Sequence, residues 1–503
     1  MKESLKVMLW GKEIGRLAWD RRRGRAYFTY HPSFLNGSIE IAPLKASVKE
    51  VRSRMPIWGD DDRKYQKLPP FLADSLPDAW GNQLFECWRT ENKLSNAEIT
   101  PLEKLSFIGK RGMGALEFEP EILHSGVRDK IDVQSLVGLA QRIFSEREKV
   151  NIRPDESLTL QSLIAIGTSA GGRQPKAIIS IHPKTGEIRS GQVGGLEGYD
   201  YCILKFGDTE RSSAELEMVY YEMACRAGIR MMESRLLDVE GQKHFLTKRF
   251  DRNGEKKLHT QTLAALYPGT DSYEKLLWVC RKMRLSERDC EEVFRRMVFN
   301  VLANNTDDHD KNFSFVMDES GGWSLSPAYD MTFIFNIGGY QPQADHCFMI
   351  RGKLNGITRQ DILDFARDNG IRRTNSIIQE VASAISGFRE LAIKYHVKDE
   401  WTGRIHTCLA QNLADWGFVS MDAPQETSFE LSGHKVENAR IEQAYRGNFH
   451  LLGTIDGREL KYIFRKGAEE YELISRVGVN RIGREKLCDL VNRYLITKIN
   501  MPK

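Results

Sequence analysis

A short polar stretch past the middle of the chain carries the residues best suited to chemistry. It reads Asn-Thr-Asp-Asp-His-Asp-Lys-Asn over residues 305–312, and a Tyr-Asp pair follows at 329–330. Asp307 and Asn312 are five positions apart, after an expected helix and before an apolar run. This spacing is typical of a phosphoryl-transfer loop, in which one carboxylate orients a hydroxyl group and one amide holds a metal ion. Asp330 then supplies the second carboxylate that binds the metal on the nucleotide phosphates.

These residues also have a plainer interpretation, a solvated acidic turn, since Asp, Asn and His are common in loops. Two observations favour the catalytic interpretation. The polar stretch lies between apolar segments, and Asp330 lies within Ser-Pro-Ala-Tyr-Asp-Met-Thr-Phe, where an unpaired charge is costly to bury. A phosphoryl-transfer site also needs elements that hold a nucleotide, and these must come from elsewhere in the chain.

A glycine-rich segment earlier in the chain is the first such element. Residues 167–176 read Gly-Thr-Ser-Ala-Gly-Gly-Arg-Gln-Pro-Lys, between apolar runs at 163–166 and 177–181 that predict strands. Such a turn can bring backbone N–H groups against phosphates, although an ordinary hairpin is an equal alternative. It is not a Walker A loop, because the Gly-Lys-Ser ending is absent. Its Gly-x-Ser-x-Gly pattern does not favour a serine hydrolase, because Pro175 and an expected strand follow instead of a helix.

Lys205 ends an apolar strand and is the candidate that grips the phosphates, although a lysine there can equally reach solvent. Its expected partner is Glu217 on the next helix, with Glu215 as the competing choice. Residues 247–252 then close a strand where a kinase hinge would meet adenine. Each motif is weak to moderate alone. Their order predicts a kinase-like site: glycine loop, strand lysine, helix glutamate, hinge, Asp-x4-Asn and metal aspartate.

Length and composition agree with a globular protein of several domains. The chain has 503 residues, which predicts roughly two to four domains, and a formal charge of +4, which neither favours nor excludes nucleic-acid binding. Its 8 cysteines form no Cys-x-x-Cys pair, which suits a reducing compartment and disfavours a structural zinc site. No run is long enough to span a bilayer, so we expect a cytoplasmic protein with no membrane contact.

Hydrophobic patterning predicts an α+β organisation in four parts. A small antiparallel sheet is expected in residues 5–45, and Ser286 is expected to cap the helix that leads into the 305–312 stretch. The tail is expected to be a small α+β appendage, with a hairpin at Asp456-Gly457 and a terminal helix. The expected parts are an N-terminal β-rich subdomain at 1–125, a kinase N-lobe at 126–262, a mainly helical C-lobe at 263–420 and an extension at 421–503.

With these residues assembled, the chain resembles the HipA family of bacterial serine/threonine kinases, the toxins of toxin–antitoxin pairs. The resemblance covers roughly residues 5–418. Its most specific part is Gly-Thr-Ser-x-Gly-Gly-x-x-Pro-Lys combined with Asp-Asp-His-x-Lys-Asn. The other matching motifs are Leu-Pro-Asp-Ala-Trp-Gly at 76–81, Ile-Gly-Lys-Arg-Gly-Met-Gly-Ala at 108–115, Lys-Arg-Phe-Asp-Arg at 248–252, His-Thr-Gln at 259–261 and Tyr-Asp at 329–330.

The resemblance implies a protein-kinase-like two-lobe fold that uses ATP and Mg²⁺. It implies Asp307 as the catalytic carboxylate and Asn312 and Asp330 as Mg²⁺ ligands. Ser169 matches the glycine-loop serine whose autophosphorylation silences members of the family, since a phosphate there would keep the loop from folding over ATP. The nucleotide-binding residues that it implies are Gly171, Gly172, Arg173, Lys176, Lys205, Glu217, Lys248, Phe250, Gln261, His309, Lys311 and Tyr329.

The implied activity is that of a protein serine/threonine kinase whose target is a protein, such as a translation component. The implied partner is a small helix-turn-helix antitoxin on a separate chain. DNA would be reached only through that partner, because this chain carries no helix-turn-helix signature. About eighty C-terminal residues extend past the family core, which leaves the partner geometry open there.

Two alternatives belong to other classes. One is a catalytically quiet binding protein that acts as a co-repressor with the antitoxin. The complete set Lys205, Asp307, Asn312 and Asp330 argues against it, since a retired site would have lost a member. The other is a small-molecule kinase of the aminoglycoside type, against which the glycine-loop serine and the N-terminal motifs argue.

Overall fold

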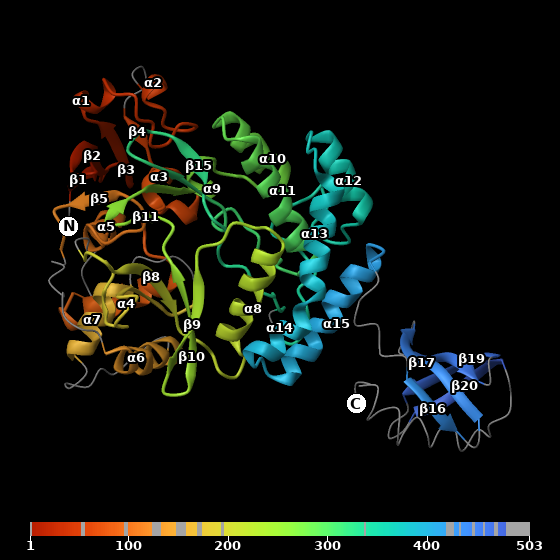
Figure 1. Ribbon diagram of the computed structural model, residues 1–503. Helices are drawn as coiled ribbons and strands as arrows, with labels where there is room; N and C mark the ends of the chain where they lie inside the picture. The colour runs from red at the N-terminus through yellow and green to blue at the C-terminus, as the bar shows by residue number, and fades with distance from the viewer. Residues whose placement is uncertain are drawn as a thin grey trace. The chain divides into compact units, whose positions relative to one another are not determined.

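A computed structural model gives the fold of the chain (Figure 1). It describes residues 3–51, 56–94, 99–122, 132–146, 157–167, 174–192, 196–336 and 339–418, together with the strands between 427 and 478. Two compact units result, Met1–Trp416 and Gly417–Lys503. No helix among the described residues is both long and apolar enough to cross a membrane. The finer division of the first unit at 125 and 262 stays a prediction.

The first unit begins with the expected antiparallel sheet, which has the strand order β4-β3-β2-β1-β5. Alternate side chains of β1 are buried, as the period of two along a strand requires. The strands are β1 Ser4–Leu9, β2 Lys12–Asp20, β3 Arg25–Tyr30, β4 Ile57–Trp58 and β5 Leu116–Glu119, and the surrounding helical segments are α1 Pro32–Leu35, α2 Val48–Val51, η1 Arg63–Tyr65, α3 Pro70–Ala73, α4 Ala79–Glu91 and α5 Pro101–Ile108.

A second antiparallel sheet, in the order β7-β6-β8-β10-β9, corresponds to a kinase N-lobe. One core cluster joins β6, β8 and β10 to side chains from α4, α6 and α7. The elements are α6 Val133–Glu146, α7 Ser157–Gly167, β6 Lys176–Ile181, β7 Ile188–Ser190, β8 Asp200–Lys205, α8 Ser213–Arg226, β9 Ser234–Val239 and β10 Gln242–Lys248.

The prediction of a strand at 163–166 is wrong, because these residues lie in helix α7. Leu160, Leu163 and Ile164 face the same core, which is helical spacing rather than strand alternation. The glycine-rich segment therefore follows a helix and precedes strand β6. Residues 168–173 lie outside the described residues.

The helical part of the first unit follows. Ser286 caps α11 as predicted, and its hydroxyl accepts a hydrogen bond from the backbone N–H of Asp289 at 3.2 Å. The helices are α9 Leu263–Leu266, α10 Tyr273–Lys282, α11 Glu287–Leu302, α12 Arg359–Asp368, α13 Thr374–Ser386, α14 Phe388–Tyr395 and α15 Asp399–Asp415, and the short strands are β11 Arg252–Asn253, β12 Lys256–Lys257, β13 His259–Thr262, β14 Ser314–Met317 and β15 Trp323–Leu325. A sheet-rich lobe followed by a helical lobe is the α+β kinase-like arrangement.

The second unit contains an antiparallel sheet in sequential order, β16-β17-β18-β19-β20. Its central hairpin is confirmed, since Ile455 of β18 pairs with Arg458 of β19. The terminal helix that was expected near 487–495 lies outside the described residues. The strands are β16 Thr427–Leu431, β17 His434–Ala444, β18 Asn448–Ile455, β19 Arg458–Lys466 and β20 Tyr471–Gly478.

Candidate active site

Residues 305–312, the loop predicted to be catalytic and called the catalytic loop below, follow the C-terminal end of α11 and are fixed by their own amide side chains. Asn305 is buried and donates from Nδ2 to Oδ1 of Asn300 at 2.9 Å, which ties the loop back to the helix. Asn312 donates from Nδ2 to the carbonyl oxygen of Asp307 at 2.6 Å. The Asp307 side chain is about half exposed, so a hydroxyl group of another molecule can approach its carboxylate.

Asp308, next to Asp307, points the opposite way and anchors the loop to the segment that carries Cys347. Its buried carboxylate accepts hydrogen bonds from the hydroxyl of Tyr273 at 2.7 Å and from the backbone N–H of Cys347 at 2.8 Å. It also lies 2.9 Å from Nδ1 of His346. The Cys347 sulfur in turn lies 3.7 Å from Oδ1 of Asp307. The segment that carries Cys347 therefore lies beside the Asp307 carboxylate, which is predicted to orient the acceptor hydroxyl group.

Lys205 lies between two carboxylates, of which the sequence predicted Glu217 as its partner but not Asp330. Its Nζ atom is 2.7 Å from Oε2 of Glu217 and forms a second ion pair with Asp330. Lys205 and Glu217 are both buried, and Asp330 adopts φ = 53°, a left-handed conformation that only fixed surroundings maintain in a non-glycine residue. Glu215, the competing choice, does not pair with Lys205.

The charges of this cluster support one another. Burial works to raise the pKa of Asp330, but the positive charges of Lys205 and Lys176 outweigh it and hold that pKa well below its usual range. Burial likewise works to lower the pKa of Lys205, yet the two carboxylates raise it, so the lysine stays charged. Burial and the neighbouring Asp330 raise the pKa of Glu217.

These residues line one cavity of about 640 Å³. Gln261 is not among the lining residues, because its amide donates to the carbonyl oxygen of Phe71 at 2.8 Å. Ser169, Gly171, Gly172 and Arg173 lie outside the described residues. The predicted residues that do line the cavity are Lys176, Lys205, Glu217, Lys248, Phe250, Asp307, His309, Lys311, Asn312, Tyr329 and Asp330.

One wall of the cavity combines aromatic side chains with an unbonded backbone donor. Phe250 stacks on Tyr329, with ring centroids 5.4 Å apart, and both line the cavity. Within the described part of the chain, the backbone N–H of Phe250 has no hydrogen-bond partner, which leaves it able to donate to a ligand. Lys248 is engaged elsewhere, since its ammonium pairs with Glu233 at 2.8 Å and Asp200 at 3.1 Å. Its ammonium group is therefore not available to a nucleotide, and its backbone N–H already donates to the carbonyl oxygen of Glu233 at 3.0 Å.

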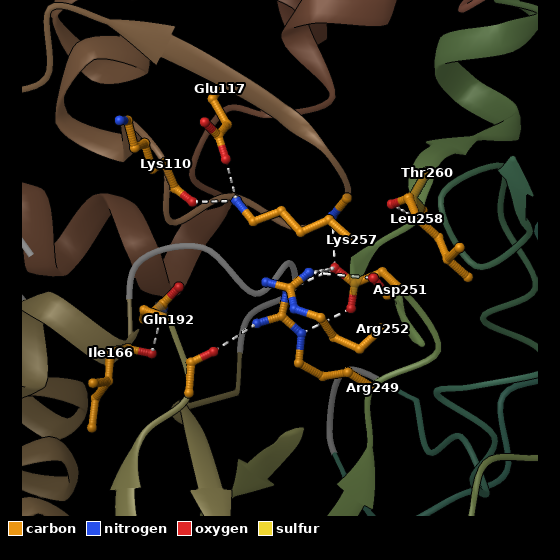
Figure 2. Close-up of polar contacts among 12 residues, drawn as sticks. Lys110, Glu117, Ile166, Gln192, Arg249, Asp251, Arg252, Lys257, Leu258 and Thr260 are labelled. Carbon is orange, nitrogen blue, oxygen red and sulfur yellow. Dashed lines mark hydrogen bonds and ion pairs between the residues drawn. The ribbon is translucent and has the colours of Figure 1, made fainter. Parts of the chain in front are cut away.

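The expected hinge, residues 247–252, contains a buried ion cluster (Figure 2). Asp251 accepts two hydrogen bonds from Arg249, at 2.8 and 2.7 Å, and one from Arg252 at 3.0 Å. All three side chains are almost fully buried. Figure 2 also shows Lys257 reaching across to the N-terminal region, where it pairs with Glu117 at 2.8 Å. Buried ion pairs therefore hold the expected hinge in place.

The N-terminal region contributes to the cavity in a way that the sequence did not reveal. Asp74 and Asp78 line it, and Asp74 accepts hydrogen bonds from the backbone N–H and the hydroxyl of Thr262 at 2.7 and 2.6 Å. The Leu-Pro-Asp-Ala-Trp-Gly motif at 76–81 includes Asp78 but indicates no role for it, and Asp74 lies outside the motif. The other unpredicted lining residues are Ser75, Leu76, Ala79, Met113, Ile203, Met231, Met232, Ser234, Phe245, Thr247, Thr260, Thr262, Ser314, Ala328 and Met331.

The donor atoms suit a magnesium nucleotide. Because the Nδ2 atom of Asn312 is bonded to the backbone, its amide oxygen is left for a metal, and Asp330 offers carboxylate oxygens. Among the described residues, no cluster of three or more His, Cys, Asp or Glu side chains could hold a metal by itself. Two protein ligands are enough for Mg²⁺, which takes the rest from phosphates and water.

The fold and the site together define a protein of the kinase-like two-lobe class. A model of the HipA N-terminal domain matches residues 5–119, and a model of the HipA-like C-terminal domain matches residues 168–387. Together they cover about two thirds of the chain. The chain belongs to the HipA family.

The individual relatives are distant. A Sinorhizobium fredii protein named "Putative kinase Y4dM" is 29% identical over 135 residues, and a Haemophilus influenzae protein named "Putative kinase" is 23% identical over 211 residues. These matches cover 23% and 38% of this chain, and 33% and 57% of the relatives. Shewanella oneidensis HipA, solved with HipB and its operator DNA, superposes with a TM-score of 0.57 at 18% identity, over 82% of this chain and 98% of that one. This likeness concerns the fold.

Proposed function

We propose that the chain is an ATP- and Mg²⁺-dependent protein serine/threonine kinase of the HipA type. The observation that carries this proposal is the convergence of Lys205, Asp307, Asn312 and Asp330 on one cavity from three separate segments. Phosphoryl transfer needs little covalent chemistry from the protein, so positioning and charge neutralisation supply most of the catalysis. These four side chains provide the groups for that task.

Each residue has a distinct role in this proposal. Asp307 orients the acceptor hydroxyl and takes up its proton, while Lys205, held by Glu217, binds the nucleotide phosphates. Asn312 and Asp330 would hold Mg²⁺, which when bound neutralises the charge that develops on the phosphates. The stacked Phe250 and the free N–H beside it would receive adenine.

The partner and the target also belong to the proposal. The Shewanella relative is solved with HipB and operator DNA, which supports a small antitoxin as the partner of this chain and DNA contact through it. The target is a protein hydroxyl, and Ser169 in the glycine-rich segment is the proposed site of autophosphorylation. A quiet co-repressor is the second candidate, and the intact charge cluster around Lys205 counts against it.

Intact mass after incubation with Mg-ATP tests the proposal. The wild type should gain one phosphate, and both Asp307→Ala and Ser169→Ala should gain none. The matched control is Asp364→Asn, which alters a partly exposed aspartate that pairs with Arg367 on α12. A wild type that gains no phosphate, transfers none to protein and shows no thermal shift with Mg-ATP would contradict the kinase and leave the co-repressor.

A further inference from the structure

Two neighbouring residues of the catalytic loop form ion pairs of opposite polarity with the N-terminal region. Asp310 lies 2.9 Å from the Nζ atom of Lys64, and Lys311 lies 2.6 Å from Oδ1 of Asp78. These loop residues fill the gap between His309 and Asn312, so they are adjacent to the groups that would perform the chemistry. The pairs span 246 and 233 residues of sequence.

Asp78 is oriented toward the loop rather than toward its own helix. It occupies the N-cap position of α4, where an aspartate ordinarily accepts a backbone N–H bond, but it makes no such cap bond. Asn82 holds the turn instead, because its Nδ2 atom donates to the carbonyl oxygens of Pro77 at 2.6 Å and Asp78 at 3.1 Å. The backbone that presents Asp78 is therefore fixed while its carboxylate reaches Lys311.

The backbone that carries Lys64 is also held in place, by the neighbouring residue Tyr65. The next residue, Tyr65, is buried and donates its hydroxyl hydrogen to the carbonyl oxygen of Ala264 at 2.7 Å. The backbone N–H of Ala264 donates in turn to the carbonyl oxygen of Asp310 at 3.1 Å. Asp310 is thus held through both its side chain and its backbone.

We propose that Lys64 and Asp78 are positioning residues for phosphoryl transfer. By pairing with Asp310 and Lys311, they fix the part of the catalytic loop that lies between Asp307 and Asn312. The order of charges is what fixes the register. A shift of the loop by one residue would place Lys311 against Lys64, or Asp310 against Asp78, and like charges in contact repel. This inference rests on the kinase activity proposed above and assigns a part of it to the N-terminal region.

Both pairs are partly exposed, with side-chain exposures of 33% and 18% for Lys64 and Asp310, and of 40% and 28% for Lys311 and Asp78. Exposed ion pairs contribute little to overall stability, so the expected effect is on loop geometry.

Charge reversal with rescue is the direct test. Lys64→Glu and Asp310→Lys should each lower kcat for phosphate transfer by about 10-fold to 100-fold, since small misplacements of catalytic groups cost that much. The KM for ATP should change little, and the double variant should recover most of the lost kcat. Lys67→Glu is the matched control, because Lys67 lies in the same segment and pairs at 2.7 Å with Asp61, away from the loop. Asp78→Asn should likewise lower kcat more than it raises KM.

A second measurement separates this inference from the proposed kinase activity. Amide hydrogen exchange of residues 307–312 should be faster in Lys64→Glu than in the wild type, and slow again in the double variant. Single variants with wild-type kcat and wild-type exchange overturn the inference, as does a double variant no better than the singles. If the wild type transfers no phosphate, the kinase proposal fails, and the exchange rates still decide whether the ion pairs hold the loop.

Discussion

The backbone N–H of Gly114 donates a hydrogen bond to Oδ2 of Asp251 at 2.7 Å, across 137 residues of sequence. Gly114 has φ = 77°, and a Cβ atom there would lie only 3.1 Å from the backbone nitrogen of Thr260. Only glycine fits this approach without displacement. The N-terminal region and the hinge therefore share one buried carboxylate, and the geometry of each depends on the other.

Asp251→Asn should destabilise the fold strongly. The change keeps the size of the side chain but leaves Arg249 buried without its counter-charge, a loss of about 3 to 5 kcal/mol for a buried pair. Urea denaturation of the full chain measures it. Asp238→Asn, at an exposed position near the end of β9, is the control and should change the free energy of unfolding by about 0.5 kcal/mol at most. Equal effects for the two variants would contradict the role of Asp251.

Lys205→Met should abolish the thermal shift with Mg-ATP and also destabilise the protein, because Glu217 is left buried beside Asp330. Adding Glu217→Gln should restore part of the stability, since the uncompensated charge is removed. It should not restore the thermal shift. Recovery of both properties in the double variant would show that Lys205 has no part in nucleotide binding.

Asp308→Asn tests the anchor behind the catalytic loop. The new amide can still accept from the backbone of Cys347, but it loses the charge that Tyr273 and His346 contact. We expect phosphate transfer to fall by about tenfold or more as the loop shifts, with the thermal shift by Mg-ATP retained. Tyr273→Phe removes a single hydrogen bond, worth about 1 kcal/mol, and should have the milder effect.

Two buried histidines predict a loss of stability in mild acid. Burial lowers the pKa of His244 and of His259 from 6.5 to about 4. The unfolded chain therefore binds more protons than the folded chain, and the free energy of unfolding falls as the pH drops from about 6.5 toward 4. Each group contributes up to about 1.4 kcal/mol per pH unit.

His244→Asn isolates one of these groups. Its oxygen can replace Nδ1 as the acceptor of the Gly207 N–H bond, which is 3.0 Å long, and it does not titrate. Urea denaturation between pH 7 and pH 4.5 should give a shallower pH dependence for this variant than for the wild type. An unchanged slope would mean that His244 is not buried in its neutral form.

The local parts of the fold followed from the sequence because their signals are local. Strand alternation in residues 5–45 and the Ser286 cap each lie within a few residues. The run at 163–166 is too short to distinguish a helix from a strand by periodicity. Its packing with α4, which is distant in the sequence, and with the preceding helix α6 decided the outcome.

The sequence likewise predicted those site residues whose type and order along the chain are informative, but not those brought to the cavity by tertiary packing. Lys205, Asp307 and Asp330 carry chemistry in their residue types, and their order along the chain is informative. Asp74 and Asp78 resemble ordinary turn residues, and only tertiary packing brings them to the cavity. Gln261 illustrates the converse case, since it lies in a motif of the family but its amide is bonded to Phe71.

Lys205 contacts Asp330 directly, so the carboxylate expected to hold magnesium already has a cationic neighbour of its own. A free divalent ion would meet a carboxylate whose charge is largely offset, and would gain little by binding alone. In the proposed kinase, nucleotide phosphates would compete with Asp330 for Lys205 and so free this carboxylate to hold Mg²⁺. We therefore expect Mg²⁺ to bind together with the nucleotide rather than alone.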